Sequence, residues 1–176
     1  MNREFLPFEE LTARVHDIWL NQWFLLTCGD YEKGDFNMMT VAWGSLGVMW
    51  NMPFVQVVVR PTRYTYEFME KYNSFTLCAF PEQYRKTLQF IGTNSGRDGD
   101  KVADSGLKAI ASTRVAAPGF DESELLLECQ KMYWDDINPE RFLDPRIDNK
   151  YPLKDYHRMY YGHIVAIFAT EKWRDK

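Results

Sequence analysis

Six long apolar runs, separated by polar segments, restrict this chain to a fold built around a β-sheet. The runs are rich in Val, Ile, Thr and aromatic residues and are bounded by Gly, Pro, Asn or Asp, as β-strands are. Several are too long and too apolar for strands with one face in water, so they predict a closed or nearly closed antiparallel barrel. The predicted strands are residues 23–29, 38–50, 54–60, 74–80, 124–133 and 161–170.

The segments between these runs predict a few short helices. In the first segment Leu11, Val15 and Ile18 follow each other at steps of four and three residues, which is the spacing of one helix face. Gly106 is suited to ending a helical turn because glycine readily adopts a positive φ. Helices or helical turns are expected at residues 8–21, 65–72, 81–92 and 101–103.

Residues 134–158 differ from the rest of the chain. They are polar, acidic and interrupted by proline. We therefore expect a long surface excursion with little regular structure in this region.

The length of 176 residues suits one domain, which we expect to span residues 1–176. The net charge of −4 provides no long-range attraction for a polyanion, so nucleic acid is not an expected partner. No stretch reaches the roughly 18 apolar residues of a membrane-spanning helix. The first ten residues lack a basic segment followed by an apolar core, so neither secretion nor membrane insertion is expected.

The three cysteines, Cys28, Cys78 and Cys129, are odd in number and lie inside apolar runs. This pattern favours reduced thiols in a cytoplasmic protein. The chain has only three histidines and no CxxC pair, so we expect no metal site.

The stretch RPTRYTYEF is the first candidate for a ligand site. It follows an apolar strand, carries Arg60 and Arg63, and opens a predicted helix near Thr65. Two guanidinium groups and the free N–H groups of a helix start can hold an anion such as phosphate. The alternative is that both arginines are solvated or paired with Glu67 and Glu70.

The stretch TNSGRDGDK is the second candidate. Ser95, Gly96 and Lys101 would form a glycine-containing loop with hydroxyl and ammonium donors, which suits a phosphate and a polyol tail. A plain turn of mixed charge explains the same residues. Neither this stretch nor the first contains the glycine pattern of a nucleoside triphosphate pocket or of a Rossmann fold.

The stretch GDFNMMTVAWGSLGVMW is the third candidate. A planar, mostly apolar ring could lie on Met38, Met39 and Trp43, with Asn37 and Thr40 among the polar groups at its edge. The alternative is that the methionines and the tryptophan belong to the core.

Four motifs in order, NMMTVAWGSLGVMW, VVVRPTRYTYEFME, TNSGRDGDKVADSGL and HRMYYGHI, resemble the flavin reductase-like, FMN-binding split-barrel family, also called the flavoredoxin-like group. The resemblance runs from about Trp19 to Phe168. It implies a mainly β fold with short helices, an antiparallel split barrel of the Greek-key type. It also implies a homodimer in which each subunit holds FMN near the subunit interface.

The resemblance further implies roles for individual residues. His157 would lie on the nicotinamide side of the flavin, although a bond to the long loop that precedes it would also explain this histidine. His163 stands where the family usually has Glu, and we assign it no role. The expected neighbours of the isoalloxazine ring are Asn37, Met39, Thr40, Ala42 and Trp43; those of the phosphate end are Arg60, Arg63, Tyr64 and Thr65; and those closing over the ribityl phosphate are Ser95, Gly96 and Lys101.

Three functions are compatible with such a fold. The first is a reductase that takes hydride from NADH or NADPH onto bound FMN and passes electrons to free flavin, a metal complex or a partner protein. The second is an FMN-binding electron carrier without nicotinamide activity. The third is a barrel of the same architecture that binds another planar ligand such as haem.

Overall fold

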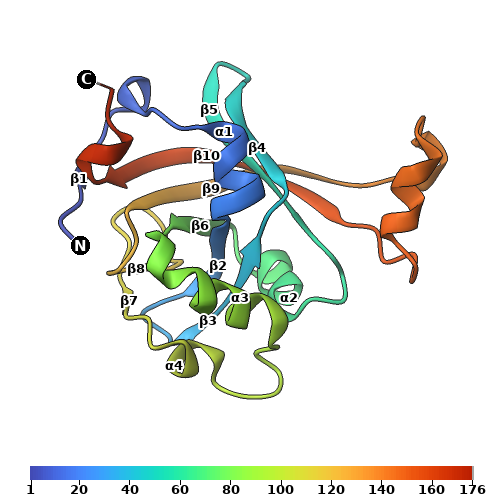
Figure 1. Ribbon diagram of the computed structural model, residues 1–176, viewed down its shortest axis with the longest axis horizontal. Helices are drawn as coiled ribbons and strands as arrows, with labels where there is room; N and C mark the ends of the chain where they lie inside the picture. The colour runs from blue at the N-terminus through green and yellow to red at the C-terminus, as the bar shows by residue number, and fades with distance from the viewer. Residues whose placement is uncertain (176) are drawn as a thin grey trace.

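Three antiparallel hairpins and one linking strand form the main sheet of the computed structural model, which describes residues 1–175 (Figure 1). The hairpins pair β2 (Phe24–Asp30) with β3 (Asp35–Val41), β4 (Gly44–Met49) with β5 (Met52–Val59), and β9 (Leu125–Asp136) with β10 (Arg158–Ala169). The linking strand β6 (Ser74–Ala79) joins β2 to β9, and β1 (Glu4–Phe5) pairs with β10. A separate ribbon pairs β7 (Ala109–Ile110) with β8 (Gly119–Phe120).

The strand order explains why the sheet curls. The order is β3-β2-β6-β9-β10-β5-β4, so β3 and β4 stand at opposite ends of it. Only residues 42 and 43 separate these two strands in sequence. The sheet must therefore bend round until its ends nearly meet, which gives a split barrel and confirms the predicted fold class.

Five of the six predicted strands are confirmed with shifted ends. The prediction of one strand over residues 38–50 was wrong, because the chain leaves the sheet at Ala42 and Trp43 and returns as β4. At Gly44 the chain approaches the indole of Trp19 so closely that a Cβ would lie 2.4 Å from it. The sequence does not reveal this break between β3 and β4, because the apolar composition continues through residues 42 and 43.

The helices are short. They are α1 (Val15–Asp17), α2 (Tyr64–Lys71), α3 (Arg85–Thr93) and α4 (Lys101–Ser105). The helix or turn predicted at residues 8–21 is confirmed in two parts, a 3-10 turn at its start (Phe8–Glu10) and, near its end, α1 running into a π-helical turn (Ile18–Gln22). The others are confirmed, with Gly106 ending α4 at φ 68°. The 3-10 turns are Phe8–Glu10, Glu82–Tyr84, Pro139–Arg141, Pro145–Lys150 and Glu171–Trp173.

Two apolar clusters fill the molecule, and strand alternation assigns side chains to one or the other. The larger contains Leu26, Met39, Val57 and other inward-facing residues of the strands, all buried. The smaller contains Leu25 and Met38, together with residues of β6, α3 and β8. Both α2 and α3 contact β3, and both lie on the same side of the barrel (Figure 1).

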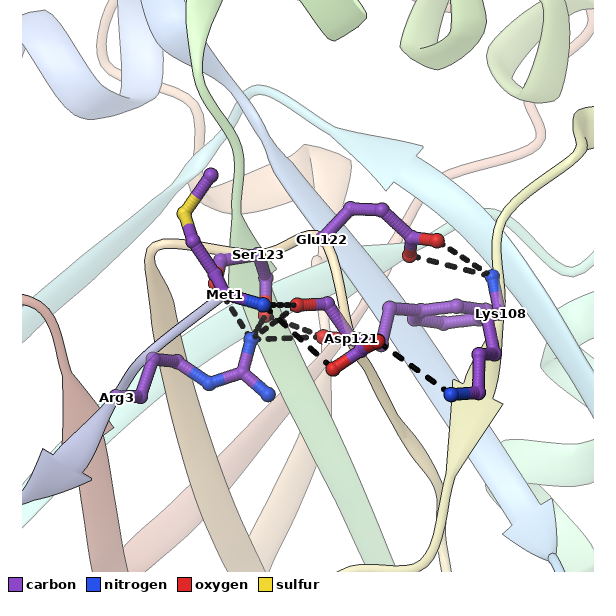
Figure 2. A network of polar contacts seen from close by, with 7 residues as sticks. Met1, Arg3, Lys108, Asp121, Glu122 and Ser123 are labelled. Atoms are coloured by element: carbon purple, nitrogen blue, oxygen red, sulfur yellow. Dashed lines mark hydrogen bonds and ion pairs between the residues drawn. The ribbon is translucent and has the colours of Figure 1, made fainter.

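Polar contacts join the N-terminal residues and Lys108 to the turn after β8 (Figure 2). The Arg3 guanidinium donates to the backbone carbonyls of Phe120, at 2.8 Å, and Ser123, at 2.5 Å. The Lys108 ammonium lies 3.5 Å from the Asp121 carboxylate. These contacts hold the turn after β8 beside the smaller apolar cluster.

Residues 137–157, called the arm below, stand away from the body of the molecule (orange in Figure 1). Little regular structure was expected from residue 134 to residue 158, which is wrong at both ends, because β9 continues to Asp136 and β10 already starts at Arg158. The Arg158 guanidinium donates to both oxygens of Asp136, at 2.7 and 2.8 Å, which ties the two strands together where the arm begins. Among the described residues, no helix has the length and apolar character needed to cross a bilayer.

Candidate functional site

Two neighbouring hollows lie at one end of β3 and share Met39. The wide pocket has a volume of about 200 Å³, and the cation pocket one of about 80 Å³. The wide pocket is lined by Met39, Thr40, Val41, Ala42, Trp43, Val58, Arg60 and His157. The cation pocket is lined by Met39, Thr62, Arg63, Tyr64, Thr65, Thr93, Asn94, Ser95 and Lys101.

The cation pocket contains two positive side chains without a counter-ion. Lys101 is only 5% exposed, and burial, assisted by the charge of Arg63, lowers its pKa to about 8. Burial and the charge of Arg60 likewise lower the pKa of Arg63. Within residues 1–175, Lys101 donates to the carbonyl of Asn94 at 3.3 Å and Arg63 to that of Gly92 at 2.7 Å, and neither forms an ion pair. A buried or half-buried cation without a carboxylate partner is stabilised by an anion that comes within hydrogen-bond distance.

Helix α2 begins at this pocket and adds further donors. Arg63 occupies the N-cap position, and its side chain makes no capping hydrogen bond. The first N–H groups of the helix and the positive end of its dipole therefore favour an anion at the same place as the two cations.

Asn37 and Gly96 support the cation pocket from behind, through contacts with residues that line it. The buried Asn37 amide donates to Thr65 Oγ1 at 2.8 Å and fixes that side chain. A Cβ on residue 96 would lie 2.5 Å from Asn37 Oδ1, so only glycine allows the loop to approach this closely. Strand β3 is thereby linked both to α2 and to the loop before α4.

The wide pocket is apolar on one side and polar on the other. Met39 is buried, whereas Trp43 is half-exposed, with its ring centroid 5.2 Å from that of His157. Thr40 Oγ1 donates to the carbonyl of Leu88 in α3 at 2.6 Å, which holds β3 against this helix. A flat ring could therefore contact sulfur and indole carbon while imidazole and guanidinium groups face its other parts.

Arg60 lies in the wide pocket and is engaged by the arm. Its guanidinium donates to Asp155 at 2.6 Å and to the carbonyl of Lys150 at 2.7 Å, and it lies over the Tyr151 ring at 4.8 Å. Burial acts to raise the pKa of Asp155, but the hydrogen bond and charge of Arg60 outweigh it and lower that pKa. Arg60 thus connects the arm to the barrel and, unlike Arg63, already has an anionic partner, while its expected contact with a phosphate stays a prediction.

His157 closes the wide pocket from the arm side. It is 9% exposed, and burial together with the charge of Arg60 lowers its pKa to about 4, against the opposing effect of Asp155. Its Nδ1 lies 2.8 Å from the hydroxyl of the buried Tyr151. The bond to the preceding loop, offered above as an alternative, therefore exists together with a place in the pocket.

Most of the predicted site residues meet at these two pockets. Asn37 and Gly96 line neither pocket and lie beside the cation pocket, next to Thr65 and Tyr64. Met38 also lies outside both, because successive side chains of β3 point to opposite faces and Met38 is fully buried in the smaller apolar cluster. His163 lies outside both pockets, on β10. Thr62, Thr93 and Asn94 also line the cation pocket; they lie inside the quoted motifs but were not predicted as site residues. Tyr151 and Asp155 were not predicted either, because the sequence gives no local signal for them.

A larger cavity of about 400 Å³ has different walls, formed in part by Gln22, Arg85 and Lys172. The Arg85 guanidinium donates to backbone carbonyls and stacks on Trp23, and Lys172 pairs with Glu124 at 2.6 Å. Because Arg85 and Lys172 already have protein partners, this cavity is a weaker candidate for binding an anionic ligand.

The protein resembles several others of similar architecture. An uncharacterized protein of Pyrococcus abyssi is 26% identical over 152 residues, which cover 85% of this chain and 74% of that protein. The FMN-binding domain of a flavin reductases-like enzyme from Shewanella baltica superposes with a TM-score of 0.68 at 16% identity, covering 96% of this chain and 77% of the other. Flavoredoxin from Methanosarcina acetivorans superposes with a TM-score of 0.64 at 25% identity, covering 85% and 69%.

The family model described as the flavin reductase like domain matches residues 21–172. This range contains both pockets and every strand except β1. The chain therefore belongs to the flavin reductase-like domain family.

Proposed function

We propose that this protein binds FMN and uses it as an NADH- or NADPH-dependent flavin reductase. The observation that carries the proposal is a pair of cations that have no carboxylate partner among residues 1–175, the buried Lys101 and the half-buried Arg63, next to a wide pocket with an apolar wall. A ligand with a phosphate at one end and a flat ring at the other fits this combination. The shared wall residue, Met39, would lie beneath the link between the two ends.

Each part of such a ligand has named partners. Lys101, Arg63 and the first turn of α2 would hold the phosphate, with Ser95 and Thr65 as hydroxyl donors. The ring would lie against residues 39, 40, 42 and 43. When bound, FMN supplies the group that accepts hydride and passes electrons on. The side chains of this chain bind and orient it, and none is required as a nucleophile.

His157 and Arg60 would face the hydride donor. Since the pKa of His157 is lowered to about 4, its imidazole is neutral at physiological pH and can donate one hydrogen bond. The Arg60 guanidinium, which is paired with Asp155, adds positive charge next to His157. This pairing suits a neutral carboxamide beside a negatively charged dinucleotide, which is the chemistry of reduced nicotinamide.

The test is the anaerobic absorption spectrum of the FMN-loaded protein, recorded before and after one equivalent of NADH and then NADPH. Bleaching of the flavin band supports the reductase. The substitution His157→Gln should slow bleaching and leave FMN bound, whereas His16→Gln, at an exposed position, should change neither. A bound flavin that stays oxidised with both nucleotides would contradict the reductase.

That last outcome would favour an FMN-binding electron carrier without nicotinamide activity, a function suggested by the similarity to flavoredoxin. A carrier should exchange electrons with a protein donor such as a ferredoxin and remain oxidised with NADH and NADPH. For the reductase, the electron acceptor would be free flavin, another small molecule or a protein.

We also propose that the protein is a homodimer. Aromatic rings of Trp50, Phe54, Tyr133 and Tyr161, called the aromatic face below, contact one another on the outside of the sheet, at centroid distances of 5.6 to 6.1 Å. Trp50 is 56% exposed, and Leu143 on the arm is 99% exposed. A second copy covering this face and the arm would remove that apolar surface from water.

We place this dimer in the cytoplasm, without a nucleic-acid or membrane partner. The three cysteines are buried and unpaired, and burial raises the pKa of Cys28 to about 12 and that of Cys78 to about 11. Such thiols are inert and suit a reducing compartment. Labelling of intact and unfolded protein with a thiol reagent tests this: reaction only after unfolding is expected.

A further inference from the structure

The contact between Tyr151 and His157 determines which nitrogen of the imidazole carries the proton. Both side chains are buried, with Tyr151 2% exposed, and the hydroxyl lies 2.8 Å from Nδ1. The imidazole, neutral above acid pH, carries a single N–H, either at Nδ1 or at Nε2. The two possibilities place opposite demands on the tyrosine.

If Nδ1 carried the proton, the phenol oxygen would accept it, and the hydroxyl proton would need another acceptor. Among the described residues the hydroxyl has no other acceptor within hydrogen-bond reach. A buried O–H group without an acceptor is costly, and buried hydroxyls are almost always paired. The hydroxyl therefore donates to Nδ1, and the imidazole proton resides on Nε2.

Tyr151 is itself held in place by groups of the arm and of the barrel. The Arg60 guanidinium lies over its ring at 4.8 Å and is fixed by Asp155 and by the carbonyl of Lys150. On its other sides the Tyr151 ring contacts Phe142 and Tyr156, at centroid distances of 6.3 and 4.9 Å. Burial raises the pKa of Tyr151, so its hydroxyl keeps its proton.

We propose that Tyr151 is a positioning residue, which fixes the neutral Nε2–H form of His157 and so presents a hydrogen-bond donor to the wide pocket. The charged groups that face the imidazole are Arg60 and Asp155. The consequence for hydride transfer rests on the proposed function. The tautomer itself does not, since it follows from the contacts of the flavin-free chain.

The test compares the protein with Tyr151→Phe, which removes the hydroxyl and keeps the ring. The matched control is Tyr156→Phe in the same arm. It removes a hydroxyl that donates to Asp148 at 2.8 Å and makes no contact with Nδ1 of His157. Each protein is labelled with ¹⁵N-histidine and studied by NMR without flavin, and His157→Gln identifies the His157 signals. Circular dichroism establishes that each variant is folded.

In the unaltered protein we expect Nδ1 to give the signal of an unprotonated acceptor and Nε2 that of a protonated nitrogen, with titration near pH 4. Tyr151→Phe should give a mixture of the two forms and an upward shift of the titration midpoint, because the neutral form loses a hydrogen bond. Tyr156→Phe should change neither. A protonated Nδ1 in the unaltered protein, or an unchanged tautomer and midpoint in Tyr151→Phe, would overturn the proposal.

A second measurement separates this inference from the proposed function. With FMN bound, anaerobic reduction by NADH or NADPH should be insensitive to mildly acidic pH in the unaltered protein, and should become sensitive in Tyr151→Phe as His157 gains charge. If neither nucleotide reduces the flavin while the NMR result holds, the reductase fails and the positioning role of Tyr151 stands.

Discussion

Replacing Lys101 with Met should stabilise the flavin-free protein and weaken FMN binding. The buried ammonium has its pKa lowered from 10.5 to about 8, because burial and Arg63 disfavour its charged form. At about 1.36 kcal/mol per pH unit, this depression corresponds to an unfavourable contribution of about 3 kcal/mol. Methionine fills similar space and carries no charge, so Lys101→Met removes that contribution.

The sign and the pH range of this effect follow from proton binding. Between about pH 8 and 10.5 the unfolded chain holds a proton on Lys101 that the folded chain has lost, so stability rises with pH across this range. The advantage of Lys101→Met should therefore be complete below pH 8 and vanish as the pH approaches 10.5.

In the FMN complex the same substitution is unfavourable, because the Lys101 ammonium would then bond the phosphate. A charged hydrogen bond contributes about 1.5 to 3 kcal/mol, so Lys101→Met should weaken FMN binding by roughly 10- to 150-fold. Riboflavin has the same ring and no phosphate, so its affinity should not change.

The assay is urea unfolding of both proteins at pH 7 and pH 10, in buffer without phosphate or sulfate, followed by fluorescence titration with FMN and with riboflavin. The control is Lys108→Met, because that side chain is 72% exposed. A less stable Lys101→Met protein at pH 7, or an equal loss of riboflavin and FMN affinity, would refute the reasoning.

Three further predictions concern other parts of the molecule. Glu128→Gln should lower the free energy of unfolding in urea by about 1 to 3 kcal/mol with FMN affinity unchanged, because the buried carboxylate accepts two backbone N–H groups of the β7–β8 loop, at 2.6 and 2.8 Å; unchanged stability would contradict this. Gly96→Ala should weaken FMN binding in a fluorescence titration, since its Cβ would displace Asn37, whereas Gly99→Ala, whose nearest contact is 3.9 Å away, should have no effect; equal affinities for all three proteins would exclude a role for the close approach. Trp50→Glu should convert the proposed dimer to monomers in sedimentation velocity, and an unaltered dimer would exclude the aromatic face as its interface.

The sequence predicts the barrel because its strands are long, apolar and β-branched, and these properties are local. It also predicts part of the cation pocket, since Arg63, Thr65 and the start of α2 are neighbours in the chain. The contacts of Arg60 could not be predicted, because its partner Asp155 lies 95 residues away and only the arm brings the two together.

The sequence also does not show which face of β3 a given side chain points to. Met38 and Met39 are consecutive and chemically identical, yet one belongs to the smaller core cluster and the other to both pockets. A shift of one residue in the register of β3 would exchange them, and no local pattern in NMMT fixes that register. The position of β3 between β2 and the two helices decides it.

The most direct test of the central claim is the affinity of the flavin-free protein for FMN compared with that for riboflavin. If Lys101 and Arg63 both bond the phosphate, each contributing about 1.5 to 3 kcal/mol, FMN should bind at least 100-fold more tightly than riboflavin. Equal affinities would mean that the cation pocket does not hold the phosphate, and the assignment of the site would be wrong.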